Sequence, residues 1–144
     1  MIYLDTSIVV SLLCTDTNST AAAMLMQEVS EPVLLTSFAK LETVNALHLR
    51  LFRKEIAEAQ LATALGKLEV HIRSRVFPLL PLPETAFRRA EELSRMITPR
   101  LGARAADLLH VAAALELGAG SFFSFDRTQR RAAEAARLSV NPWP

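Results

Sequence analysis

The chain has 144 residues, with 16 basic and 15 acidic side chains and a formal net charge of +1. This length suits a single domain over residues 1–144, which would bury about two thirds of the surface that its unfolded chain exposes. A charge so close to zero gives no electrostatic sign of a polyanionic partner. Hydrophobic residues make up 51% of the sequence, so we expect an apolar surface that contacts a partner.

The N-terminal segment and the single cysteine bear on location. Met1 leads directly into a short apolar segment that ends at Asp5, without the basic residues that begin a signal peptide. The apolar residues 8–14 are too few to span a bilayer. Cys14 has no partner for an internal disulfide and lies in apolar sequence, which is typical of a packing residue in a reducing compartment. We therefore expect a cytoplasmic protein with no membrane insertion.

Short apolar runs alternate along the chain with segments of helical periodicity. Strands are predicted at residues 2–4, 33–36, 75–80, 122–125 and 138–140. Helices are predicted at residues 19–29, 38–52, 55–72, 84–96 and 127–137, and in an alanine-rich segment that reaches residue 117. Pro78 removes a backbone donor, which predicts that the third strand lies at an edge. Pro99 and Gly118 are expected to stop the helices before them, and Trp143 to anchor the tail.

This alternation predicts an α/β fold with a mainly parallel sheet that helices cover on both faces. In such sheets, ligand sites form beyond the carboxyl ends of the strands. Asp5 follows the first predicted strand, and Asp126 follows the fourth. Two acids that are far apart in the sequence are therefore expected at one edge of the sheet.

Two further acids lie in apolar sequence. Glu42 and Asn45 interrupt the apolar stripe of the helix predicted at residues 38–52. Asp107 stands among alanines and leucines, where an unpaired carboxylate would lose several kcal/mol of hydration. Each has a simpler interpretation, since Glu42 could pair with Arg50 or with the Asn45 amide. Asp107 could cap the start of its helix.

Asp5 and Asp126 could also be helix caps, but the four acids as a group favour a metal site. Two carboxylates about 5 Å apart repel by roughly 3 kcal/mol at an effective dielectric constant near 20. A divalent cation among them removes this repulsion. Because the donors are all oxygen atoms, they favour magnesium or manganese over zinc. The predicted catalytic and metal-binding residues are Asp5, Glu42, Asp107 and Asp126.

Other polar residues are candidates for supporting roles. Thr6, Ser7 and Ser124 flank the acids at the strand ends, where their hydroxyl groups could bind water or phosphate, or cap the backbone. Asn45 stands beside Glu42 on the same helix face. His110 comes one helical turn after the third acid and could face the cleft, but a lone histidine among alanines and leucines is more often a packed core residue.

Four pieces of the sequence agree in order and spacing with one known family. They are residues 2–7 (IYLDTS), 41–47 (LETVNAL), 105–114 (AADLLHVAAA) and 123–127 (FSFDR). Over nearly its whole length the chain resembles a PIN domain, and specifically the VapC-type toxin ribonucleases of bacterial and archaeal toxin–antitoxin pairs.

The resemblance implies a five-stranded parallel sheet between helices, with the four acids gathered at its carboxyl edge around one or two magnesium or manganese ions. Ser124 matches the family's small hydroxyl residue two positions before the last acid. The resemblance also implies hydrolysis of RNA phosphodiester bonds, a homodimer, and an antitoxin whose C-terminal segment covers the acidic cleft. Since arginine suits bidentate phosphate contact, the residues predicted to bind RNA are Arg100, Arg104, Arg127 and Arg130.

Two other functions are compatible with parts of the sequence. A phosphoaspartate domain, receiver-like or haloacid-dehalogenase-like, would use Asp5 as the phosphorylated residue. Such sites need a lysine late in the chain, whereas the last of the three lysines is Lys67. A non-catalytic, dimeric RNA- or protein-binding module would use the acids only as helix caps. Magnesium titration separates these functions, because a ligand that binds only the folded state raises its stability.

Overall fold

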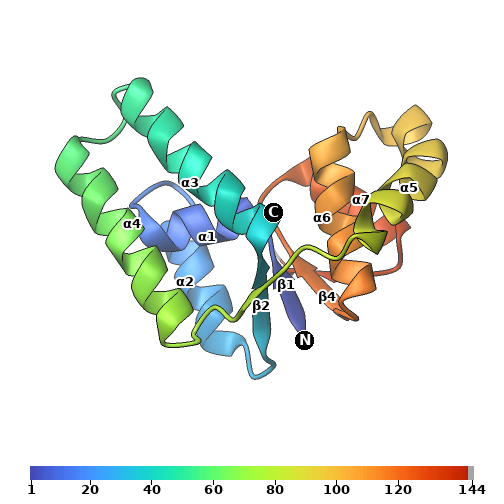
Figure 1. Cartoon of the computed structure of the whole chain (residues 1–144), viewed down its shortest axis with the longest axis horizontal. Coiled ribbons are helices and arrows are strands. Elements are labelled where there is room, and N and C mark those ends of the chain that lie inside the picture. Colours follow the sequence, from blue (N-terminus) through green and yellow to red (C-terminus); the bar gives the residue numbers. More distant parts are fainter. Residues whose placement is uncertain (143–144) are drawn as a thin grey trace.

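In the computed structural model, which describes residues 1–142, a five-stranded sheet lies between two groups of helices (Figure 1). The strand order is β3-β2-β1-β4-β5, with β1 (Ile2–Leu4), β2 (Val33–Thr36), β3 (Leu79–Leu80), β4 (Ser121–Phe123) and β5 (Ser139–Val140). The helices are α1 (Thr6–Leu13), α2 (Ser19–Glu28), α3 (Ser37–Phe52), α4 (Glu58–Arg73), α5 (Thr85–Leu101), α6 (Ala105–Glu116) and α7 (Arg127–Ala135). All neighbouring strands pair in parallel, which confirms the predicted α/β fold.

The central strands place successive side chains in two hydrophobic cores, one on each face of the sheet. Ile2 and Leu4 of β1 and Leu35 of β2 pack in the core that α1 to α4 complete. Tyr3 and Leu34 point the other way, into the core formed with α5, α6 and α7. Figure 1 shows the same division, with α1 to α4 on one side of the sheet and α5 to α7 on the other. Burial on both faces explains why these strands are unbroken apolar runs.

Most elements begin and end within a few residues of the prediction, but α1 was not predicted. Residues 6–13 follow β1 directly, and five of the eight residues in this helix are buried. Helical periodicity is visible only where one face is polar, so a helix buried on most sides gives little pattern. The structure thus adds a helix whose N-cap is Asp5.

Two smaller differences concern segments with a proline. The third strand is shorter than predicted, but it does lie at the edge of the sheet. Helix α5 continues through Pro99, which lies in its last turn, and ends where Gly102 adopts a φ of 65°.

Among the described residues, no helix is both long and apolar enough to cross a membrane. Trp143 lies outside the described residues.

Three helices begin at the edge of the sheet where the parallel strands end. The side chains of Asp5, Thr36 and Asp126 cap α1, α3 and α7, accepting hydrogen bonds from backbone N–H groups at 3.1, 3.1 and 2.9 Å. Each such cap contributes about 1 kcal/mol. The register pairs Leu4 with Phe123, so β1 and β4 deliver the residues that follow them to neighbouring positions. The capping roles considered for Asp5 and Asp126 are therefore real, but each cap uses only one oxygen.

An ion pair joins the loop after α1 to helix α3. Asp16 Oδ2 accepts hydrogen bonds from Arg50 Nη2 at 2.7 Å and from Ser11 Oγ at 3.0 Å, and Oδ1 accepts one from the Asn18 N–H at 2.9 Å. Burial raises the pKa of Asp16, but these hydrogen bonds and the charge of Arg50 lower it by more, to below its ordinary value of 3.8. The interaction holds α3 in place beside α1.

The stabilisation from this ion pair should depend on pH. Because the pKa of Asp16 is lowered in the folded state, its contribution is complete above the unfolded-state value and is lost as pH falls through the folded-state value. Urea unfolding should show a larger difference in stability between the native protein and Asp16→Asn near about pH 6 than near about pH 2. A difference that is the same at every pH would contradict this account.

Leu47 packs α3 against the core. It is completely buried, whereas Leu49 on the same helix is 40% exposed. We expect Leu47→Ala to lower the free energy of unfolding by about 2–5 kcal/mol, because it removes buried methyl groups and leaves a cavity. Leu49→Ala is the matched control and should cost no more than about 1 kcal/mol. Equal losses in urea unfolding would show that α3 buries a different face.

Candidate functional site

A cavity of about 460 Å³ opens beyond the carboxyl ends of the strands. Its wall is formed by the exit of β1 with α1, the loop after α1, one face of α3 with the turn that follows it, and Gln129 of α7. The residues predicted from the sequence that line it are Asp5, Thr6, Ser7, Glu42 and Asn45. The cavity thus lies at the edge of the sheet where the sequence predicts a site, and its role as that site stays a prediction.

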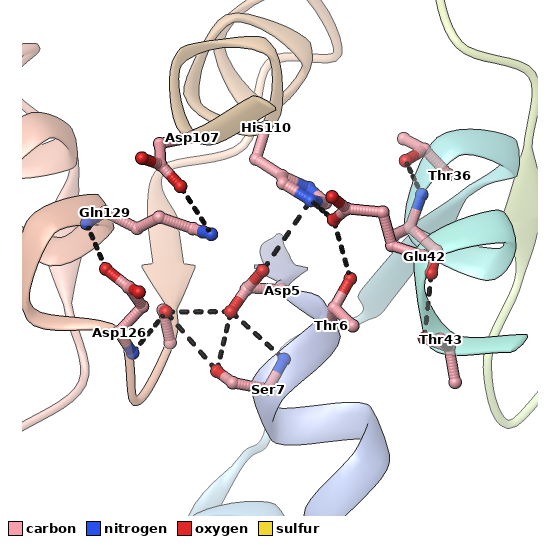
Figure 2. A network of polar contacts seen from close by, with 12 residues as sticks. Asp5, Thr6, Ser7, Thr36, Glu42, Thr43, Asp107, His110, Asp126 and Gln129 are labelled. Carbon is pink, nitrogen blue, oxygen red and sulfur yellow. Dashed lines mark hydrogen bonds and ion pairs between the residues drawn. The ribbon is translucent and has the colours of Figure 1, made fainter. Parts of the chain in front are cut away.

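Asp5 is held through one of its two carboxylate oxygens (Figure 2). Oδ2 accepts hydrogen bonds from the Ser7 N–H at 3.1 Å, from Ser7 Oγ at 2.6 Å and from Ser124 Oγ at 2.8 Å. Oδ1 is buried, and it has no hydrogen-bond partner among the described residues. Since Asp5 is only 1% exposed, a charged oxygen left without a partner is costly, and a cation would offset that cost.

The two serines join Asp5 to the loop after β4. Ser7 Oγ accepts a hydrogen bond from the Phe125 N–H at 2.9 Å, and Ser124 Oγ accepts one from the Asp126 N–H at 2.9 Å. A serine hydroxyl has one proton to donate, and the hydrogen bonds to Asp5 use it. Both serines therefore act on the site through Asp5, by fixing the orientation of its carboxylate.

Glu42 approaches Asp5 from α3. Its Oε2 accepts a hydrogen bond from Thr6 Oγ1 at 3.0 Å and is in hydrogen-bond contact with His110 Nε2. His110 Nε2 also lies 3.7 Å from Asp5 Oδ1. One side-chain atom from each of Asp5, Glu42 and His110 lies within 4.8 Å of the other two. Arg50, one partner considered for Glu42, is instead paired with Asp16.

The electrostatics of this group fit a divalent cation. Burial raises the pKa of Glu42, but the hydrogen bond and charge of His110 and the hydrogen bond of Thr6 lower it by more, so Glu42 is ionised near neutral pH. Two carboxylates at this separation repel by roughly 3 kcal/mol at an effective dielectric constant near 20. Asp5 Oδ1, which is buried and has no hydrogen-bond partner among the described residues, is the atom best placed to bind a cation that relieves this repulsion.

The other two predicted acids lie on either side of Gln129 (Figure 2). Its backbone N–H donates to Asp126 Oδ1 at 2.9 Å, and its side-chain Nε2 lies 3.4 Å from Asp107 Oδ1. Asp107 Oδ2 accepts a hydrogen bond from the Arg104 N–H at 2.8 Å, so it caps α6 from inside the first turn. Gln129 is buried, and its Oε1 has no partner among the described residues. Gln129 lines the cavity, whereas neither of these two acids is among the residues of its wall.

His110 and Gln129 were not among the site residues predicted from the sequence. His110 is completely buried, as expected for a core residue, but it also contacts Glu42. Its position three residues after Asp107, on the same helix face, was a usable signal. For Gln129 the sequence offered no signal, because nothing local distinguishes it from the polar residues around it in α7.

Four arginines are predicted to bind RNA: Arg100, Arg104, Arg127 and Arg130. Among the described residues, none of these four lines the cavity. Arg104 is beside one acid, with Nε 3.5 Å from Asp107 Oδ2. Arg130 donates to a backbone carbonyl of the C-terminal segment at 3.3 Å. The arginines that do line the cavity are Arg50 and Arg53. RNA contact by the four predicted arginines stays a prediction.

Several solved structures have a similar fold. VapC20 of Mycobacterium tuberculosis, described as a toxin that cleaves the sarcin-ricin loop, has a TM-score of 0.72 at 19% identity, covering 99% of this chain and 100% of its own. FitAcB of Neisseria gonorrhoeae has a TM-score of 0.68 at 22% identity, covering 99% of both chains. VapBC2 of Rickettsia felis, bound to a DNA fragment from its promoter, has a TM-score of 0.67 at 17% identity, covering 100% of both. These TM-scores show that the chains share a fold, and at such low sequence identities the likeness shows the fold alone.

No curated protein matches the chain by sequence. The family model of the PIN domain matches residues 2–135, from β1 to the end of α7. This match spans the whole cavity wall and all four predicted acids. The chain therefore belongs to the PIN domain family.

Proposed function

We propose that this protein is a magnesium- or manganese-dependent endoribonuclease, and that it is the toxin of a toxin–antitoxin pair. The observation that carries the proposal is the Asp5 carboxylate, buried beside Glu42 with one oxygen saturated and the other without a partner. Membership of the PIN domain family supports nuclease chemistry. A similar fold in a toxin described as cleaving the sarcin-ricin loop supports RNA as the substrate class.

In this proposal Asp5 Oδ1 and the Glu42 carboxylate bind the cation directly. When bound, a divalent cation stabilises negative charge on a phosphodiester and lowers the pKa of a water molecule. Ser7 and Ser124 keep the Asp5 carboxylate in one orientation, and Thr6 does the same for Glu42. This preorganisation matters because a site that must reorganise during the reaction loses part of its stabilising effect.

The remaining predicted residues take outer positions. Asp107 and Asp126 would hold a second cation or an ordered water molecule across Gln129, whose unpartnered Oε1 adds a further oxygen donor. Asn45 is exposed on the cavity wall, where its amide would contact the substrate. A non-catalytic module in which the acids are only caps would leave Asp5 Oδ1 unexplained.

The substitution Asp5→Asn tests the metal assignment. Asparagine is a good helix cap, so the fold should persist while the charge is lost. Magnesium or manganese at about 100 times its dissociation constant should stabilise the native protein by about 2.7 kcal/mol. The Asp5→Asn protein should lose this stabilisation together with metal-dependent cleavage of RNA, as measured by thermal unfolding and by mapping of RNA ends.

The control is Glu55→Gln, which removes the charge of another acid that lines the same cavity. Glu55 is exposed and is not part of the proposed donor set. This variant should keep both the metal-dependent stabilisation and the cleavage. Metal-dependent RNA cleavage that survives in the Asp5→Asn protein would refute the assignment.

The proposed partners are RNA, a cognate antitoxin and a second copy of this chain, in the cytoplasm. Similar folds in VapBC2 and FitAB support an antitoxin. Large apolar side chains on the surface also indicate a protein partner, among them Leu41 at 64%, Phe52 at 82%, Phe87 at 55% and Met96 at 58% exposed.

Co-expression with the neighbouring gene of the native operon tests these partners. We expect the two products to purify together, at a mass by light scattering that exceeds one copy of each. The second product should also suppress RNA cleavage by the free chain. A monomeric chain whose cleavage the neighbouring gene product leaves unchanged would contradict the toxin–antitoxin assignment.

A further inference from the structure

His110 is a fully buried imidazole with a hydrogen-bond partner at each ring nitrogen. It lies in α6, and its ring centroid is 4.7 Å from that of Phe38 and 5.8 Å from that of Tyr3. Nδ1 lies 2.8 Å from the Tyr3 hydroxyl, and Nε2 contacts Glu42 Oε2 (Figure 2). Packing against two rings fixes the orientation of the imidazole toward Glu42.

The contact with Glu42 determines where His110 carries a proton. An ionised carboxylate can only accept hydrogen bonds. Glu42 Oε2 accepts a hydrogen bond from Thr6 Oγ1 and lies in contact with His110 Nε2, so this oxygen acts as the acceptor in the site. His110 Nε2 must therefore hold the proton that it donates to Oε2. A ring nitrogen that carries a proton has no lone pair available for a metal ion.

The contacts at His110 Nδ1 agree with a proton on Nε2. Thr36 Oγ1 accepts a hydrogen bond from the Ala39 N–H at 3.1 Å and lies 2.9 Å from the Tyr3 hydroxyl. Burial raises the pKa of Tyr3 far above its ordinary value, so the phenol keeps its proton. Thr36 can then donate to Tyr3, and Tyr3 to His110 Nδ1. His110 donates in turn to Glu42, so every polar hydrogen in this buried chain has an acceptor.

We propose that His110 is a positioning residue that orients Glu42 through its Nε2–H group, and that it is not a metal ligand. The inference rests on the proposed function, because that proposal assigns Glu42 to the metal site. The hydrogen-bond chain begins in the first turn of α3, at Ala39, and returns to α3 at Glu42. Tyr3 of β1 and His110 of α6 thus hold this carboxylate at a fixed position relative to the sheet.

The tautomer of His110 can be measured in the metal-free protein by long-range proton–nitrogen correlation with labelled histidine. We expect a protonated Nε2 that donates a hydrogen bond, and a His110→Gln protein identifies the signal among the three histidines. A bare Nε2 with the proton on Nδ1 would overturn the inference. This readout needs no metal and no cleavage, so it is independent of whether the proposed function holds.

Manganese provides the second test, since its pulsed electron paramagnetic resonance spectrum shows a ¹⁴N coupling when an imidazole binds the ion directly. We expect the bound ion to show no coupling from a directly bound nitrogen. A strong coupling that disappears in His110→Gln would make His110 a ligand and overturn the inference. Absence of any bound manganese would refute the proposed function, and the nuclear resonance result would still stand.

Three variants measure the effect on the site. His110→Ala removes the donor and should weaken manganese affinity or cleavage by about 10- to 100-fold, as is typical for loss of a partner that orients a metal ligand. His110→Gln retains an N–H donor and should recover part of that loss. Tyr3→Phe keeps the ring in the core but removes the hydroxyl, so Nδ1 loses its hydrogen-bond donor and its nitrogen chemical shift should change while Nε2 keeps its proton. Full activity in His110→Ala, with the fold intact, would contradict a positioning role.

Discussion

The site depends on the unequal use of the two oxygens of Asp5. One oxygen accepts three hydrogen bonds, from the Ser7 N–H and from the hydroxyls of Ser7 and Ser124. The other is buried and has no hydrogen-bond partner among the described residues. Burying a half-satisfied carboxylate is unfavourable in a structural residue, and it is useful when the free oxygen binds a cation. The hydrogen bonds of Ser7 and Ser124, which join the end of β1 to the loop after β4, therefore also fix the orientation of the Asp5 carboxylate.

This arrangement follows from the parallel sheet. Parallel pairing brings the ends of β1, β2 and β4 to one edge, and helices α1, α3 and α7 start there. Helix α3 carries Glu42, the second carboxylate of the site. The position of this helix relative to the sheet is fixed by Leu47 in the core and by the Asp16–Arg50 ion pair. Stability and site geometry are thus linked through one helix.

The sequence predicted the parts of the site that depend on local pattern. Asp5 and Asp126 end apolar strands, and Glu42 interrupts an apolar helix face, so these positions were visible without a structure. The side-chain directions were not predictable, because they depend on hydrogen bonds across the fold. Asp107 contacts the Gln129 side chain and Asp126 accepts from the Gln129 backbone, and only the tertiary structure shows that Gln129 lines the cavity while these two acids do not.

The role of His110 was missed for a related reason. A histidine among alanines and leucines is typical of a core residue, and it is indeed completely buried. Its contact with Glu42, 68 residues earlier in the chain, depends on how α3 and α6 meet above the sheet. Helix α1 was missed because burial on most sides removes the polar face that reveals a helix. Local sequence shows which residues are polar, but not which of them meet.

The central claim is that Asp5 and Glu42 share a divalent cation, and anomalous diffraction from crystals loaded with manganese tests it most directly. The account predicts an anomalous peak about 2.0–2.4 Å from Asp5 Oδ1, with the Glu42 carboxylate as a second protein ligand. A peak confined to other surfaces, or a well-ordered site in which Asp5 Oδ1 faces no ion in saturating manganese, would contradict it.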